Sequence, residues 1–598
     1  MGRLTDNPLW RLAGGNPIFC RVVEAAAKRA RHAVVRMVYL GVLVCVAAAL
    51  TMSSLAAGGT LTELSLRSAN LFKYISFLQL GMACLMAPIF TAGAITQEKD
   101  SQTYSVLLAT PLSNAQIVLG SLLSRLFFVL VLLASGIPIF LITQLWGGVT
   151  GKSILLSFMI AAATAIFTGA AAVAIAVVRV GTGKTIFSFY IGIGLYLAAV
   201  WALGELPALA APGGQTSTVT ALHPFASLMV VLNMTRPPTP ADLPSAGWPT
   251  RLWLCSPHYA YLCWTLSASA VMIVLGTIFV RRSHARTRLG VMRRIRLWLG
   301  GGRTTRRPRS VWANPVAWRE AATRARAGGK SIVRWVFLIL GLAGGLTLAI
   351  MTPTMAPVTA RAVLRGVLWV EFTLILLVGC NVAAGAITRE REDGTLDLLL
   401  VTPITSRYYL WGKLRGLISF SSVLLIVPIA TAAMVAVAGL LGPAPVVTGR
   451  LGRMAVPIFT VEAVFAWGVQ ALTFCALTAM IALNMSLKVR GTINAVMITV
   501  AVVAAIALGG GALAMMGLNN LGGVGPVMAS LSPYVMVSVF TSPHTVAADA
   551  LRGTSMEAFR IQVCVLSILG AGGYALMVAI LYHSMVKTFD MIIRKQSR

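Results

Sequence analysis

The stretch Ile387–Thr405, ITREREDGTLDLLLVTPIT, lies between two long apolar runs and is rich in carboxylates for this chain. A similar stretch, Ile95–Ser113, reads ITQEKDSQTYSVLLATPLS. The chain of 598 residues has only 17 Asp and Glu, and six of them lie in these two stretches: Glu98, Asp100, Glu390, Glu392, Asp393 and Asp397. A recurring segment of this length indicates an internal repeat.

The repeat extends beyond the acidic residues. With Ile95 placed opposite Ile387, the two stretches align without a gap, and identical residues include Thr103 with Thr395, Thr110-Pro111 with Thr402-Pro403, and Gly120 with Gly412. The segments that begin Asn16-Pro and Asn314-Pro align as well. We therefore predict two related halves, residues 1–300, with a basic linker from 281, and residues 301–598.

Composition places both halves in a membrane. Hydrophobic residues make up 57% of the chain and charged residues 11%, against about 25% in ordinary globular proteins. Apolar runs of membrane-crossing length recur, and a bilayer requires helices because each backbone group must be paired within its segment. The prediction is an all-α integral membrane protein with twelve spans, near 37–57, 75–95, 119–144, 153–178, 185–204, 258–280, 333–352, 366–387, 411–440, 456–486, 492–515 and 562–585.

Six spans in each half bring the chain back to the side on which it entered. The repeats are then parallel, related by a pseudo-twofold axis along the membrane normal. The net charge is +32, and its densest block is Arg281–Arg334, with sixteen basic residues and one acidic residue. The positive-inside rule then predicts that both termini and this linker are cytoplasmic. The localisation that we expect is a bacterial inner (plasma) membrane, which the chain crosses several times. No base-stacking or groove-reading module accompanies the charge, so the linker is interpreted as lying against anionic membrane lipid, without a nucleic-acid partner.

Each acidic stretch joins the second and third predicted spans of its half, on the cytoplasmic side. Acidic residues suit the start of a helix, the leucines give it an apolar face, and Thr-Pro ends it. The pattern predicts a short amphipathic helix in each half, exposed to a partner with twofold symmetry. A second amphipathic segment, residues 17–34, is expected to lie at the membrane interface before the first span.

The second half resembles a known family at these residues. The segment ITREREDGTLDLLLVTPITSRYYLWGKLRG is similar to the loop after the second span in permease subunits of ATP-binding-cassette exporters of the ABC-2 class. The matching residues are Glu390, Glu392, Gly394, Thr395, Leu396, Thr402, Pro403, Thr405, Gly412 and Lys413. The first half keeps Glu98, Thr103, Thr110, Pro111, Ser113 and Gly120, but has Gln102, Tyr104 and Ser121 in place of Gly, Leu and Lys. Fusion of two halves most resembles permeases labelled as multi-copper-enzyme maturation components.

The resemblance implies that the chain translocates an unidentified substrate, and that two copies of a separate cassette ATPase drive it. It implies that the ATPase subunits couple through Glu98, Asp100, Thr103, Thr110, Pro111, Glu390, Glu392, Asp393, Gly394, Thr395, Asp397, Thr402 and Pro403. ATP and Mg²⁺ are then expected on the partner, with no cofactor in this chain. The segment VRVGTGKTIF at Val178–Phe187 does not provide a phosphate-binding loop, because Val178 stands where the first glycine is required.

Two polar residues interrupt the predicted second spans at the same depth. Gln79 aligns with Glu371, and polar groups in spans usually face a cavity or a partner. Both are predicted to line the substrate pathway. The alternative for Glu371 is a solvated position near the outer headgroups.

The sequence offers no catalytic or metal site. Its eight cysteines form no CxxC pair, and its six histidines are dispersed, so neither a disulfide framework nor copper ligation is expected. A membrane enzyme would need acids or nucleophiles paired with histidine, and none are grouped here. Two further alternatives to a driven permease remain. One is a secondary transporter of the major-facilitator kind, and the other is a non-catalytic membrane scaffold.

Overall fold

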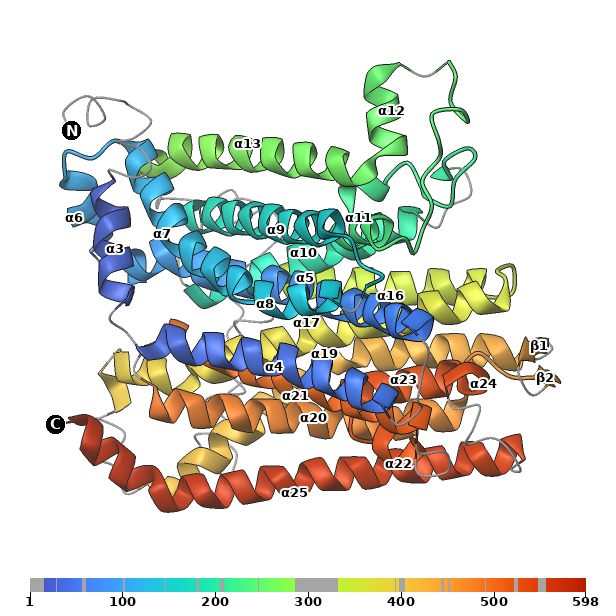
Figure 1. Ribbon diagram of the computed structural model, residues 1–598. Helices are drawn as coiled ribbons and strands as arrows, with labels where there is room; N and C mark the ends of the chain where they lie inside the picture. The colour runs from blue at the N-terminus through green and yellow to red at the C-terminus, as the bar shows by residue number, and fades with distance from the viewer. Residues whose placement is uncertain are drawn as a thin grey trace, which may run out of the picture. The chain divides into compact units, whose positions relative to one another are not determined.

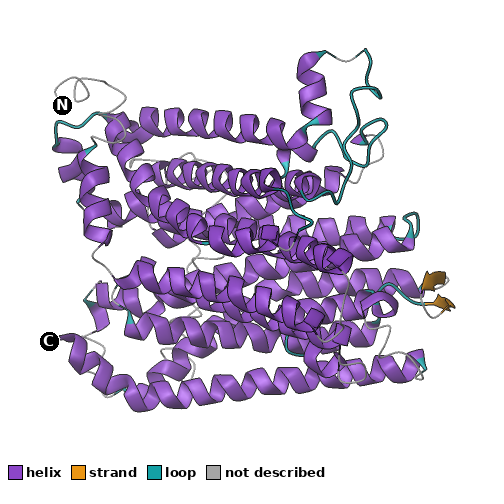
Figure 2. Ribbon diagram, in the orientation of Figure 1, coloured by secondary structure: helices purple, strands orange, loops and turns teal. Residues whose placement is uncertain are grey.

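The computed structural model describes most of the chain. The described residues are 16–27, 30–55, 61–100, 103–145, 147–178, 182–204, 209–245, 247–285, 332–392, 394–396, 404–441, 446–449, 452–489, 491–520, 525–546 and 555–597. They are helical almost throughout, with one short two-stranded hairpin (Figure 2). The predicted all-α class is confirmed.

The chain forms two compact units. Unit 1 comprises residues Met1–Val44 and Gly59–Ser310, and unit 2 comprises Cys45–Gly58 and Val311–Arg598. Each unit is described by itself below. The assignment of residues 1–300 and 301–598 to two permease halves stays a prediction.

The first half of the sequence contains eleven labelled helices and one 3-10 turn among the described residues (Figure 1). They are α3 (Pro17–Ala27), α4 (Ala30–Leu55), α5 (Leu61–Asp100), α6 (Tyr104–Ala109), α7 (Asn114–Ser135), α8 (Ile137–Leu145), α9 (Gly151–Val178), α10 (Thr182–Gly204), η2 (Thr220–Leu222), α11 (Pro224–Val231), α12 (Trp248–Cys255) and α13 (Pro257–Ala285). In unit 1, α9 packs against α5, α7 and α13. A buried cluster of Val118, Leu122, Leu126, Ala170, Val173, Ala176, Val177 and Val280 fills the space between α7, α9 and α13.

Asn16 fixes the predicted interfacial helix, α3, to unit 1. Its Oδ1 accepts from the backbone N–H of Ile18 at 3.0 Å, and its Nδ2 donates to the carbonyl of Gln116 in α7 at 2.8 Å. Gly120 permits this approach, because a Cβ there would lie 2.5 Å from Asn16 Oδ1. Residues 28 and 29 of the predicted interfacial segment, and its counterpart from Asn314, lie outside the described residues.

The second half of the sequence contains the helices α16 (Ile332–Met351), α17 (Pro357–Glu392), α19 (Ser406–Leu440), α20 (Val461–Lys488), α21 (Thr492–Asn520), α22 (Gly525–Ala529), α23 (Pro533–Thr541), α24 (Pro543–Val546) and α25 (Met556–Ser597). The strands β1 (Val446–Gly449) and β2 (Gly452–Ala455) form an antiparallel hairpin after α19, with Val446 opposite Ala455. An aromatic cluster packs α17 against α20 and α23. The ring centroid of Phe372 in α17 lies 5.8 Å from that of Trp467 in α20 and 5.3 Å from that of Tyr534 in α23.

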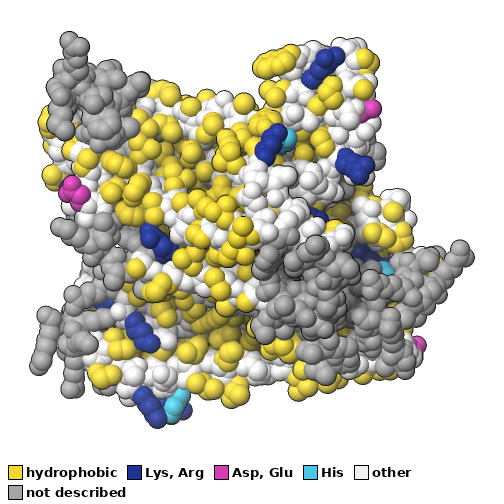
Figure 3. Space-filling model, in the orientation of Figure 1, with side chains coloured by type: hydrophobic (Ala, Val, Ile, Leu, Met, Phe, Trp, Pro, Cys, Tyr) yellow, Lys and Arg dark blue, Asp and Glu magenta, His cyan; other side chains and the backbone are white. Residues whose placement is uncertain are grey.

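Ten helical segments among the described residues are long and apolar enough to cross a membrane. They are α5, α7 with α8, α9, α13, α16, α17, α19, α20, α21 and α25. Hydrophobic side chains dominate the described surface in Figure 3, as lipid contact requires. The two other predicted spans correspond to shorter apolar segments, Arg36–Cys45 in α4 and Gly192–Trp201 in α10. The structure thus supports a multi-pass membrane protein, and the number twelve stays a prediction.

Candidate functional site

The first acidic residue of the second stretch is bonded inside unit 2. Glu390, in the last turn of α17, pairs with Lys413 of α19 at 2.7 Å between Oε1 and Nζ. Lys413 Nζ also donates to the Ala386 carbonyl at 3.1 Å, and the Tyr409 hydroxyl donates to the Glu390 carboxylate. The side chain of Lys413 is 1% exposed and that of Glu390 is 13% exposed. Glu390 therefore holds α17 against α19.

The next two residues bind the ends of two other helices. The Glu392 carboxylate accepts from the backbone N–H and the hydroxyl of Thr492, each at 2.8 Å, at the start of α21. Its charge suits the positive N-terminal end of a helix. Arg391 donates to the carbonyls of Leu487 at 2.9 Å and Val489 at 3.2 Å, at the end of α20. Three consecutive residues thus tie the end of α17 to α19, α20 and α21.

The first stretch repeats part of this arrangement in unit 1. Lys99, which aligns with Arg391, donates to the carbonyls of Ala176 at 2.9 Å and Val177 at 2.6 Å, at the end of α9. Each basic side chain thus caps the negative C-terminal end of the fourth predicted span of its half, which is α9 in unit 1 and α20 in unit 2. Lys99 and Arg391 were not among the predicted site residues. Their signal was a basic residue directly after the first glutamate of each acidic cluster.

The threonines that follow the acids also occupy matching positions. Thr103 Oγ1 donates to the Glu98 carbonyl at 3.3 Å, and Thr395 Oγ1 donates to the Glu390 carbonyl at 3.1 Å. Thr103 also donates to the Glu98 carboxylate, which has no counterpart in unit 2. Lys413 has no counterpart either, since Ser121 occupies the aligned position. The two loops therefore share the hydrogen bond from the threonine to the backbone carbonyl of the first glutamate. They differ in the partners of that glutamate's carboxylate, which include Thr103 in unit 1 and Lys413 in unit 2.

The predicted short helix is present in unit 1 as α6. Its Leu107 and Leu108 pack against the buried cluster of α7, α9 and α13, whereas Val106 is 67% exposed. Thr110 Oγ1 donates to the Leu107 carbonyl at 2.6 Å, and Pro111 follows with an exposed side chain. Ser113 and Gln116 form a capping box that starts α7. The helix thus has an anchored apolar face and an exposed one.

The corresponding part of unit 2 is described only at its beginning. Gly394, at φ +67°, has open space around the position of a Cβ, and Thr395 is exposed while Leu396 is buried. Asp393, Asp397, Thr402 and Pro403 lie outside the described residues. Asp100 is the last residue of α5, and its side chain is likewise outside them.

Gln79 and Glu371 are buried in the long second helices of their halves, α5 and α17. Gln79 is 1% exposed, and neither polar atom of its amide has a hydrogen-bond partner. Glu371 is 7% exposed; its Oε1 accepts from Thr431 of α19 at 3.3 Å, and its Oε2 has no partner. This burial argues against the alternative of a solvated Glu371 near the headgroups. Lining of a pathway stays a prediction.

Replacing Glu371 by leucine should therefore separate stability from transport. An unpartnered buried polar atom costs about 1–3 kcal/mol, so Glu371→Leu is expected to raise the free energy of unfolding by up to that amount. If the carboxyl faces the substrate, the same variant loses transport. Thermal unfolding and transport measured on one preparation check both parts. A lowered unfolding temperature in Glu371→Leu but not in Glu371→Gln would contradict the interpretation that the buried Glu371 carboxyl destabilises the fold.

Removing a basic cap should loosen the helix that it caps. Lys99→Met and Arg391→Met are each expected to lower the free energy of unfolding by about 1 kcal/mol, since each removes a charged donor from a helix C-terminus. Arg389→Met, at an exposed residue of the same turn as Arg391, is the matched control. Hydrogen exchange at the ends of α9 and α20 measures the local effect. Equal exchange in Arg389→Met and Arg391→Met would argue against capping.

The described residues contain no group of three or more His, Cys, Asp or Glu that could hold a metal ion. The features brought together at the ends of α5 and α17 are hydrogen bonds and ion pairs between helices, with exposed apolar and small residues beside them. These contacts fix the ends of α5 and α17 to the neighbouring helices of their units.

A comparison with known families matches one segment within the second half of the chain. Residues 370–585 match the family model described as ABC-2 family transporter protein. The match begins within α17 and ends within α25. It confirms the resemblance found in the sequence. No curated protein matches the chain.

Proposed function

We propose that this chain, whose residues 370–585 match the model of the ABC-2 family transporter protein, is the membrane component of an ABC transporter, namely the permease of an exporter driven by separate ATPase subunits. ATP and Mg²⁺ are bound by the partner. In this chain Thr182–Thr185 of the GTGKT sequence form the first turn of α10, and the preceding element is the membrane helix α9, whereas a phosphate-binding loop follows a strand.

The observation that carries the proposal is that a basic residue of each acidic stretch caps the end of a membrane helix in its own unit. Lys99 caps α9 in unit 1, and the aligned Arg391 caps α20 in unit 2. A partner that pushes on either stretch therefore moves a membrane helix at once, and does not merely displace a loop. Two matching stretches suit two copies of one ATPase subunit, in keeping with the symmetry of closed assemblies.

The docking surface consists of the exposed residues beside these braces. In unit 1 it includes Val106, Thr103 and Pro111, and in unit 2 Gly394 and Thr395. Glu390 and Glu392 fix the conformation of the second acidic stretch through their contacts with α19 and α21, and the partner binds the surface that this conformation presents. ATP-driven closure of the two subunits would then move the helix ends and change the side to which the substrate pathway opens.

Orientation supplies a first test of the proposal. Thr395→Cys should react with a membrane-impermeant maleimide in inside-out vesicles and not in intact cells, since both termini are cytoplasmic. Ala241→Cys, exposed in the loop between α11 and α12, should show the reverse. Labelling is read on the modified peptide by mass spectrometry, so that native cysteines do not interfere. Addition of the ATPase should protect Thr395→Cys and leave Ala241→Cys unchanged; protection of neither would remove the docking claim.

A further inference from the structure

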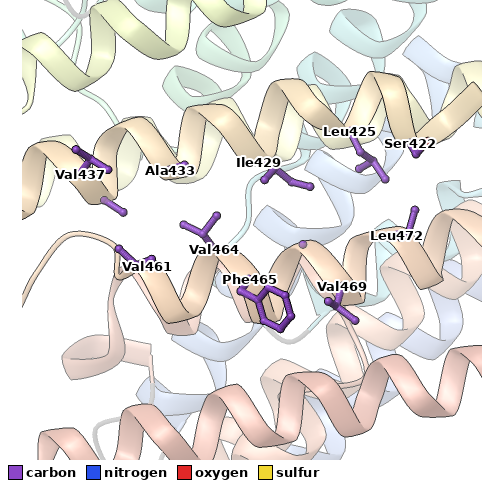
Figure 4. A pocket seen from close by; sticks show the side chains of 12 residues that line it. Ser422, Leu425, Ile429, Ala433, Val437, Val461, Val464, Phe465, Val469 and Leu472 are labelled. Carbon is purple, nitrogen blue, oxygen red and sulfur yellow. The ribbon is translucent and has the colours of Figure 1, made fainter.

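Unit 2 contains a cavity of about 450 Å³ between α19 and α20 (Figure 4). Its lining is apolar, with Ser422 as the one polar side chain among the lining residues. On α20 it follows one face of the helix, at the spacing of Val461, Val464, Phe465, Gly468 and Leu472. On α19 it runs from Ser422 to Val437. We refer to this cavity as the α19–α20 groove.

The length of the groove along α20 matches the thickness of one membrane leaflet. From Val461, the first residue of α20, to Leu472 the helix rises by about 16 Å, roughly half of the ~30 Å hydrocarbon layer. The groove lies at the end of these helices that carries the β1–β2 hairpin. Phe465 in its wall is 69% exposed. The groove is therefore open along its side to the acyl chains of one leaflet.

A pair of opposite charges stands at the hairpin end. Glu462, next to Val461, accepts from Arg560 Nη2 of α25 at 2.8 Å. The side chains are 63% and 36% exposed, so both charges remain available to a further ligand. A guanidinium can bind phosphate while paired on another edge, because it has five donors in a planar fork. An apolar groove with a guanidinium near one end is complementary to a phospholipid, which carries its phosphate at one end of its acyl chains.

We propose that the α19–α20 groove binds one acyl chain of a phospholipid whose headgroup phosphate contacts Arg560. The site concerns lipid binding alone, and it does not depend on the ATPase partner.

Filling the groove should displace the lipid. The test uses the full chain in vesicles of phosphatidylglycerol and phosphatidylcholine that carry a trace of chain-spin-labelled phosphatidylglycerol. A Cβ at Gly468 would lie 3.4 Å from Ile429 Cδ1, so Gly468→Leu projects into the groove. Gly572→Leu, on the exposed face of α25 with nothing near its Cβ, is the matched control. Gly468→Leu should reduce the motionally restricted signal and Gly572→Leu should not; Gly468→Ala, with a smaller effect, guards against misfolding.

The proposed headgroup contact predicts opposite effects for substitutions of Arg560 and Glu462. Arg560→Gln should lower the preference for phosphatidylglycerol over phosphatidylcholine about fivefold, the size expected for one basic side chain at a membrane surface. Glu462→Gln should raise it, because the arginine loses its internal counter-charge. Equal signals from Gly468→Leu and Gly572→Leu would overturn the proposal. So would a change of oligomeric state in Gly468→Leu, which would mean that a second copy of the chain fills the groove.

Discussion

Lys413→Met is expected to lower the free energy of unfolding by about 3 kcal/mol, because removing one partner of a buried ion pair leaves the other charge uncompensated. Lys413 is almost fully buried, and its ammonium contacts both Glu390 and the Ala386 carbonyl. The loss should appear as a lower unfolding temperature of the detergent-purified chain. Because Glu390 holds the end of α17, the variant should also couple poorly to any ATPase that binds it.

A double variant distinguishes the ion pair from simple loss of packing. Lys413→Met combined with Glu390→Leu removes both charges, and apolar replacement of a buried pair is often neutral or stabilising. We expect the double variant to recover most of the lost stability while its coupling stays impaired. Stability of the double variant that merely equals the sum of the two single losses would show that the two side chains do not act as a pair.

Val106→Asp is expected to weaken binding of the ATPase subunit by at least about tenfold, since it places a charge on the apolar part of the proposed docking surface. Val106 is 67% exposed on α6, so the folded chain should tolerate the change. Its neighbours Leu107 and Leu108 face the buried cluster of unit 1. Leu107→Asp should therefore lower the unfolding temperature, whereas Val106→Asp should not.

The control for this experiment is Val106→Thr, which keeps the shape and adds no charge. Binding is measured by titrating the purified ATPase onto the immobilised chain. Unchanged affinity in Val106→Asp would mean that α6 is not a docking surface, and a parallel fall in the unfolding temperature would mean that the helix has been disrupted instead.

The helical class and the two matching stretches could be predicted from the sequence because they depend on local composition. Long apolar runs specify membrane helices, and α6 follows from a leucine run that ends at Thr110-Pro111. The sequence also predicted a polar position at Gln79 and Glu371, where the structure has buried side chains. These features need no knowledge of distant contacts.

The roles of the carboxylates could not be predicted in the same way. The role of Glu390 and Glu392 in coupling to a partner stays a prediction, but their contacts within the chain could not be predicted: Lys413 and Thr492 are far along the chain and are brought close by the packing of α17 with α19 and α21. An acidic residue at a helix end has the same sequence pattern whether it meets a partner protein or a neighbouring helix. The repeated basic residue, Lys99 and Arg391, was visible in the sequence, but the carbonyls that it caps could not be predicted, since they lie at the ends of helices far along the chain.

The central claim is that this chain is the membrane component on which separate ATPase subunits dock at two matching sites. The most direct measurement is the mass of the intact complex formed when the full chain is purified together with a candidate cassette ATPase subunit. The account predicts two ATPase subunits per chain in the wild type and one in Val106→Asp, which damages the unit 1 site alone. A folded chain that binds no ATPase, or a Val106→Asp variant that still binds two, would contradict it.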